Sequence, residues 1–316
     1  MRDFASCFSD YAVQVVSETT SCYSYSNTSC FPQNSSTPST QNSVTCLYKV
    51  ILSNKKQYLI TVSWSKTNVS QSLCIQFGDD PSNSFKLSAN SRIFKKKKGS
   101  KAIELFDHTK VEVFWDLCEA RYNMSGGPEP TDGYYVLVTF DSEIGLILGD
   151  IDEEKKFKNC NSMAKFTLVS RQEHFSGNTL YSTKAQFCDN GSKHDILISC
   201  GGENEGQNHH HHHHHNHNHP VLSVCIDKKM VIRVKRLQWN FRGNQSIFLD
   251  GLLVDLMWDV HDWFFNPTSG SAVFMFRTRS GLESRLWLED KYKDKLMHKN
   301  QDKVEFSLMI YANKST

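Results

Sequence analysis

The sequence predicts an all-β protein, and two observations lead to this fold class. Short segments rich in β-branched and aromatic residues, such as 44–52, 57–64 and 71–77, are separated by turns containing Asn, Lys, Gly and Pro. Helical periodicity is almost absent from the 316 residues, of which 39% are hydrophobic and 12% aromatic. Many short strands at regular spacing are typical of antiparallel β-sandwiches.

The segment at 101–123 recurs at 244–266 without a gap, at an offset of 143 residues. This alignment matches Trp115 with Trp258, Asp116 with Asp259 and Leu105 with Phe248. The flanking blocks recur in the same order. We therefore expect an internal duplication that gives two tandem β-sandwich copies at 44–173 and 174–316. A single merged sandwich is the alternative.

The repeated segment reads as a half-buried strand. Val111, Val113 and Trp115 alternate with polar residues, and this period of two places them on one face. We expect Trp115 and Trp258 to be structural core residues, each inside its own sandwich. Helical turns are expected only at 152–158 and 289–299.

Two segments lack the pattern of packed structure. Residues 1–43 are rich in Ser, Thr and Asn, so we predict a disordered N-terminal tail. The loop at 203–220 carries a low-complexity run of histidines: His209, His210, His211, His212, His213, His214, His215, His217 and His219. Neutral imidazoles bind zinc, nickel or copper, but a defined site needs ligands held rigidly. We favour a disordered insertion over a metal site, and we expect no cofactor.

Bulk composition limits the partners and the compartment. The net charge of +2 gives no general attraction to nucleic acid, so we do not expect that partner. No run of about 18 apolar residues predicts a membrane span. The N-terminus lacks the apolar core of an export signal, and the ten cysteines contain no Cys-x-x-Cys pair. We expect reduced thiols and a soluble protein of the cytosol or nucleus.

Basic residues cluster in both copies, at 92–101 and 228–242. The candidate anion-binding or lipid-binding residues are Lys95, Lys96, Lys97, Lys98, Lys101, Arg233, Lys235 and Arg236. Trp239 and Phe241 lie among the second set. Such hairpins can bind anionic lipid headgroups, but lysines also protect edge strands from mispairing. We favour the protective role and keep lipid binding open.

Carboxylates form a third candidate set, consisting of Asp79, Asp80, Asp116, Asp141, Asp150, Asp152, Asp259 and Asp290. Loop carboxylates at one end of a sandwich can hold calcium. Asp116 and Asp259, however, alternate with core residues, so we expect them to accept hydrogen bonds from loops. Motifs of hydrolases, phosphate-binding loops and zinc proteases are missing, and His108, His174, His194, His261 and His298 stand isolated in the sequence. We expect no enzyme.

Several blocks together resemble a plant family called "domain of unknown function 868". They include FGDDPSNSFKL, VEVFWDL, GPEPTDGYYV and SEIGLILGD, and the resemblance covers nearly the whole chain. It implies a plant protein and offers no activity or site residue to carry over. The histidine run departs from the family pattern.

The function expected from these features is binding without catalysis. We expect an intracellular interaction module with protein partners. The alternative is a peripheral membrane module that binds anionic phospholipid through the two basic hairpins, resembling the calcium- and lipid-binding β-sandwiches.

Overall fold

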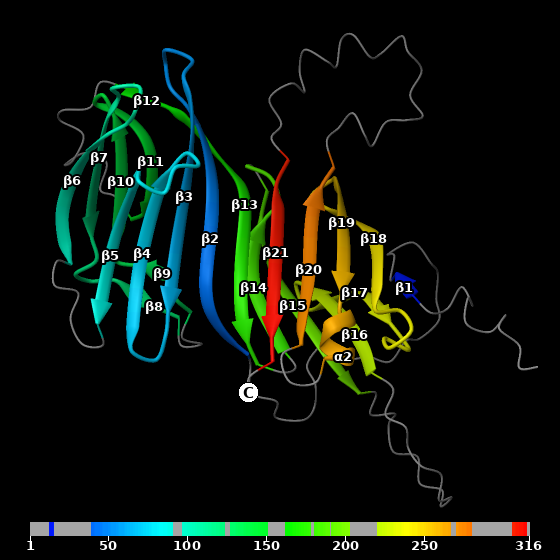
Figure 1. Cartoon of the computed structure of the whole chain (residues 1–316). Coiled ribbons are helices and arrows are strands. Elements are labelled where there is room, and N and C mark those ends of the chain that lie inside the picture. The colour runs from blue at the N-terminus through cyan, green and yellow to red at the C-terminus, as the bar shows by residue number, and fades with distance from the viewer. Residues whose placement is uncertain are drawn as a thin grey trace, which may run out of the picture. The chain divides into compact units, whose positions relative to one another are not determined.

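The computed structural model describes residues 13–15, 39–90, 97–123, 127–150, 162–177, 180–189, 191–202, 220–266, 270–279 and 305–314. Most of these residues belong to strands, as the sequence predicts (Figure 1). The described helix, α2 (His261–Phe265), follows the strand that contains Trp258. The sequence predicted no helix in this segment. The two predicted helical turns lie outside the described residues.

The chain divides into two compact units. The first unit consists of 40–174 with 289–309, and the second of 175–288 with 310–316 and β1. The division passes through two strands, β13 and β21, rather than through a linker between tandem domains.

In the first unit, one sheet has the order β13-β2-β3-β4-β5 and the other has the order β12-β11-β10-β7-β6. A short hairpin, β8-β9, adds to them. The strands are β2 (Thr40–Ile51), β3 (Gln57–Lys66), β4 (Ser70–Phe77), β5 (Ser84–Asn90), β6 (Lys98–Glu104), β7 (Lys110–Asp116), β8 (Arg121–Tyr122), β9 (Pro130–Asp132), β10 (Tyr135–Phe140), β11 (Glu143–Gly149), β12 (Ser162–Met163) and β13 (Lys165–Ser176).

The second unit has the same type of arrangement. One sheet has the order β1-β17-β16-β15-β14, and the opposite layer contains the neighbouring strands β18-β19-β20-β21. The strands are β1 (Val13–Val15), β14 (Leu180–Gln186), β15 (Lys193–Gly202), β16 (Pro220–Ile226), β17 (Lys229–Val234), β18 (Arg242–Leu249), β19 (Leu252–Asp259), β20 (Ser271–Thr278) and β21 (Ser307–Asn313).

Each unit buries its core between its two sheets. In the first unit, Tyr58 on β3 stacks on Phe140 of β10, with ring centroids 4.7 Å apart. In the second, Tyr181 on β14 packs against Phe274 of β20 at 6.2 Å. Burial alternates along the central strands because successive side chains point to opposite faces. Each unit is therefore a two-layer β-sandwich.

A tryptophan lies across a glycine of the neighbouring strand in both units. Trp115 on β7 pairs with Gly99 on β6, and Trp258 on β19 pairs with Gly243 on β18. Both indoles are buried, at 3% and 4% exposure. A Cβ atom on Gly99 would lie 2.9 Å from the Trp115 ring, and one on Gly243 would lie 2.2 Å from the Trp258 ring. Only glycine gives the indole this space.

The gap-free alignment of the two segments is wrong on one side of the hairpin. Five residues separate the last pair of β6 and β7, Glu104 and Lys110, whereas two separate Leu249 and Leu252. The offset is thus 143 on the tryptophan strand and 144 on the strand before it. A one-residue slip reverses which face a side chain occupies. Leu105 is accordingly 7% exposed, whereas its predicted match, Phe248, is 79% exposed.

The predicted tail boundary is also wrong. Strand β2 begins at Thr40, four residues before the predicted start, and Val13–Val15 forms β1 against β17. The first four residues of β2, Thr40 to Ser43, are all polar, and their polarity masked the strand pattern. The rest of residues 1–38 lies outside the described residues.

Substituting Gly243 with Ala should destabilise the protein by about 1–3 kcal/mol, because overpacking forces the Trp258 ring out of its position. Urea unfolding followed by tryptophan fluorescence measures the loss. Gly201→Ala is the control, since the nearest side-chain atom would lie 4.0 Å away. In a Trp258→Ala background the Gly243→Ala cost should nearly disappear. An unchanged cost there would contradict the proposed contact.

Candidate functional site

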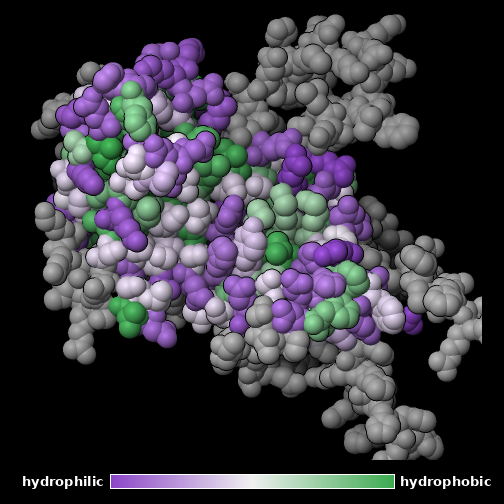
Figure 2. Space-filling model, in the orientation of Figure 1, coloured by the Kyte–Doolittle hydropathy of each residue, from purple (hydrophilic) through white to green (hydrophobic). Residues whose placement is uncertain are grey.

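An exposed group of aromatic and basic side chains lies in the second unit, where the connection between β17 and β18 meets α2. We name it the aromatic–basic patch, and it consists of Arg236, Trp239, Phe241, Arg242, His261 and Phe265. Trp239 is 71% exposed and Phe265 is 58% exposed. Figure 2 shows that hydrophobic residues on the face in view are scattered among hydrophilic ones. Exposed aromatic residues grouped with arginines therefore stand out as a candidate binding surface.

The rings of Phe241, His261 and Phe265 contact one another. The Phe241 centroid lies 5.2 Å from the His261 ring and 5.9 Å from the Phe265 ring, in edge-to-face geometry. The guanidinium of Arg242 lies 5.7 Å from the Phe241 centroid, and its Nε donates to Asp259 Oδ2 at 2.8 Å. These contacts order side chains that would otherwise lose rotamer freedom when a partner binds.

The backbone holds the patch in place through the core. Leu237 is fully buried, and the indole Nε1 of Trp258 donates to the Asn240 carbonyl at 3.0 Å. The amide of Val260 donates to the Phe241 carbonyl at 2.8 Å. Arg236 adopts a left-handed backbone conformation, with φ of 52°. The connection is thus anchored by its buried residues, while Trp239 remains exposed.

The predicted basic residues of the first unit that the structure describes on β6 contact other residues of the same sandwich. Lys98 forms an ion pair with Asp116 at 2.9 Å, and Lys101 lies over the Phe85 ring at 5.7 Å. Both are on β6, an edge strand, where lysines hinder edge-to-edge pairing. Lys97 is exposed, and Lys95 and Lys96 lie outside the described residues.

The two basic clusters lie at different places in their units. Lys98 and Arg242 both begin the strand beside the tryptophan strand, and both pair with the aspartate after the tryptophan. Arg233 is instead on β17, which belongs to the sheet opposite β18. Lys235 directly follows β17.

The predicted metal ligands give no site in the described chain. His209 to His219 all lie outside the described residues, as do Asp152 and Asp290. Asp80 accepts from the amide of Ser82, Asp141 from that of Lys110 and Asp150 from that of Gly133. In the described segments, no three His, Cys, Asp or Glu side chains are arranged to hold a metal ion. There, these carboxylates fix turns.

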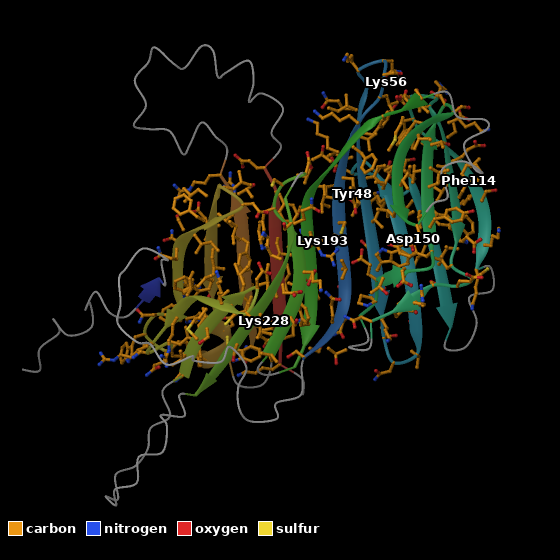
Figure 3. The ribbon with its side chains drawn as sticks, turned by 180° about the vertical axis from the view of Figure 1, so that it is seen from behind. Tyr48, Lys56, Phe114, Asp150, Lys193 and Lys228 are labelled. Carbon is orange, nitrogen blue, oxygen red and sulfur yellow. The ribbon has the colours of Figure 1, made fainter. Side chains whose placement is uncertain are left out.

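Sequence reasoning treated His194 as isolated, and the structure shows otherwise. Its Nδ1 lies 2.6 Å from Asp227 Oδ2, and its Nε2 lies 3.0 Å from Asp250 Oδ2. The three residues come from three separate parts of the second unit, so no local motif could reveal them. Figure 3 labels their neighbours Lys193 and Lys228.

A buried ionic cluster lies in the first unit. The Nε of Arg171 donates to Glu173 at 2.5 Å, and its NH2 group donates to Glu129 at 2.7 Å. The side chain of Glu173 is fully buried and also accepts from Gln41 at 2.8 Å. Burial raises the pKa of the nearby Cys46 thiol to about 11, and burial also raises the pKa of Tyr48 (labelled in Figure 3). Both groups are therefore neutral at physiological pH, and the cluster joins β2, β13 and the loop before β9.

Arg171→Leu should destabilise the protein by about 3–5 kcal/mol, because it leaves buried Glu173 without its cation. An unpaired buried carboxylate has a raised pKa, so the deficit should be larger at pH 8 than at pH 5. Urea unfolding at both pH values measures it. Arg121→Leu is the control, since its pair with Asp132 is exposed and should contribute at most about 1 kcal/mol. Equal losses in the two variants would contradict the role of the cluster.

Within the described residues, no helix has the length and hydrophobicity needed to cross a membrane. Comparison with curated proteins gives no match. Among solved structures, kievitone hydratase from Nectria haematococca matches at 8% identity, covering 76% of this chain and 84% of that chain, with a TM-score of 0.26. At this TM-score the match supports no transfer of fold or activity. A family model described as "Plant protein of unknown function (DUF868)" matches residues 39–314, and the chain therefore belongs to this plant family.

Proposed function

We propose that this chain is a non-catalytic interaction protein that binds a protein partner through the aromatic–basic patch. The observation that carries the proposal is the exposure of Trp239 on an anchored connection and of Phe265 on α2, where Phe265 contacts Phe241, over which Arg242 lies. Tryptophan and arginine are the residue types that contribute most binding energy at protein interfaces. Ordered side chains lose less entropy on association, which favours binding at this surface.

Internal duplication is part of the proposal. Its support is the repeated order of strands around the tryptophan, β6-β7-β10 in one unit and β18-β19-β20 in the other. The aspartate after each tryptophan makes the same two contacts, with a cation on the paired strand and with an amide two residues later. On this proposal the units diverged at the connection between the sheets, where the second unit carries the patch.

The chemistry of the buried polar groups favours binding over catalysis. A general base needs a free ring nitrogen, and both nitrogens of His194 face carboxylates. The Arg171 guanidinium is directed at Glu129 and Glu173 inside the first unit. We assign the protein to the cytosol or nucleus, supported by the buried thiols of Cys46 and Cys200, which form no disulfide.

A second candidate function is binding to anionic phospholipid. It is favoured by one observation: Arg236 and Trp239 are both exposed and belong to one turn, in which the Trp239 amide donates to the Arg236 carbonyl at 2.8 Å. Indoles favour the bilayer interface, and each nearby cation adds about 1 kcal/mol at an anionic surface. The lysines of β6 contribute less to this candidate because they contact Asp116 and Phe85.

The double variant Trp239→Ala/Phe265→Ala should lose the partners that the full-length wild type captures by proximity labelling in plant cells. Each exposed ring can be removed at a stability cost within about 0.5 kcal/mol, so the fold should persist. Phe248→Ala is the matched control, because Phe248 is 79% exposed at the opposite end of β18. The proposal fails if the double variant and the control capture the same proteins as the wild type.

Sedimentation with vesicles distinguishes binding to lipid from binding to a protein partner. Wild type should remain in the supernatant with phosphatidylcholine vesicles and with vesicles containing phosphatidylserine, both at low salt. Binding only to the anionic vesicles, abolished by Arg236→Glu, would replace the protein partner by a lipid surface.

A further inference from the structure

His194 connects two hairpin turns of the second unit. It lies on β15 and is 7% exposed. Asp227 begins the two-residue turn between β16 and β17, in the same sheet as His194. Asp250 begins the two-residue turn between β18 and β19, in the opposite sheet. The imidazole therefore links the two layers of the sandwich at one end.

Backbone geometry fixes both carboxylates toward the ring. The central residues of each turn have positive φ, 49° and 68° at Asp227 and Lys228, and 50° and 73° at Asp250 and Gly251. These values are those of the tight turns that suit the twist of a β-hairpin. The carboxylates also accept from the backbone, Asp227 from the Asp195 amide at 2.9 Å and Asp250 from the Ser192 amide at 3.0 Å.

The contacts require a proton on each ring nitrogen. An ionised carboxylate can only accept hydrogen bonds, so Nδ1 and Nε2 must both donate. A neutral imidazole carries one proton and would turn a lone pair toward one of the two carboxylates. The full set of contacts therefore exists only when His194 is an imidazolium.

We propose that His194 is a protonation-dependent latch that fastens the β18–β19 hairpin to the opposite sheet and releases it when the ring loses a proton. The hairpin tip carries Phe248, which is 79% exposed. Protonation of His194 thus controls how firmly an exposed aromatic residue is held. The inference is independent of the aromatic–basic patch, which lies at the other end of β18.

Charged groups on each adjoining element affect the latch. They are Asp227 and Lys229 on the β16–β17 hairpin, Asp250 on the β18–β19 turn, Lys193 and Asp195 on β15, and Lys184 on β14. Lys184 is paired with Asp195 at 3.0 Å, so these two largely offset each other. Burial lowers the pKa of His194, but the hydrogen bonds to Asp227 and Asp250 outweigh burial and raise it above the usual 6.5.

The direction of the pH dependence follows from these shifts. Because folding raises the pKa of His194, the latch stabilises fully below about pH 6.5 and is lost as pH rises through the folded pKa. Folding lowers the pKa of Asp227 and Asp250, so their contribution is present above about pH 3.9 and lost as pH falls through their folded pKa values. The latch is therefore strongest between about pH 4 and pH 6.5.

The first unit contains a matched link that should not respond to pH in this range. Tyr58 on β3 donates to Asp107 Oδ2 at 2.6 Å, and Asp107 belongs to the turn between β6 and β7. Burial and the bond to Asp107 raise the pKa of Tyr58 above its usual value of about 10. The tyrosine therefore keeps its proton where His194 would lose it.

Hydrogen exchange of the full-length chain, measured by mass spectrometry from pH 6 to pH 9 and corrected for intrinsic rates, tests the latch. Protection of peptides spanning 244–256 should fall as pH rises. The total fall should be about tenfold for each pH unit by which the folded pKa of His194 exceeds its unfolded pKa. Peptides spanning 100–114 should keep constant protection. Constant protection in both hairpins, or equal loss in both, would overturn the proposal.

Variants separate the latch from a purely structural role. Asp250→Asn, on an exposed turn, should flatten the pH dependence of the 244–256 peptides while leaving the 100–114 peptides unchanged. His194→Tyr copies the link of the first unit and should make protection independent of pH. A pH dependence that persists in the Asp250→Asn variant, or an NMR titration giving His194 a pKa at or below 6.5, would refute the assignment.

Discussion

An indole lying across a glycine of the adjacent strand is the contact on which each sandwich depends. Trp115 and Trp258 fill the interior beside Gly99 and Gly243, where any side chain would collide with the ring. The pairing fixes the register of the edge strand, since only glycine can face the ring. It also places the aspartate after each tryptophan opposite a cation, so the ion pairs of Lys98 and Arg242 follow from the same register.

Polar contacts then hold the ends of the layers together. Asp107 accepts a hydrogen bond from the Tyr58 hydroxyl in the first unit, and Asp250 accepts one from the His194 ring in the second. Glu143, at the start of β11, accepts from both the amide and the hydroxyl of Ser53. Hydrophobic burial is not directional, whereas these hydrogen bonds have defined partners. The carboxylates thus fix the positions of the turns, while aromatic packing stabilises the core.

The two units use their basic residues differently. On β6 of the first unit, lysines are engaged with a carboxylate and a ring of their own sandwich, which suits protection of an edge strand. In the second unit, the connection between the sheets turns outward at Arg236 and exposes Trp239. The lysines of β6 thus contact groups of their own sandwich, whereas Trp239 of the second unit remains exposed.

The sequence by itself determined the all-β class, the alternating strands and the burial of Trp115 and Trp258, because these follow from local periodicity and side-chain size. It could not determine the one-residue difference between the hairpin turns, since a period-two pattern aligns almost equally well at neighbouring registers. It also gave no sign of helix α2 or of the Arg171 cluster. Only the tertiary structure brought Asp227 and Asp250 to His194, because those residues lie 33 and 56 positions away along the chain and meet through strand pairing and sheet packing.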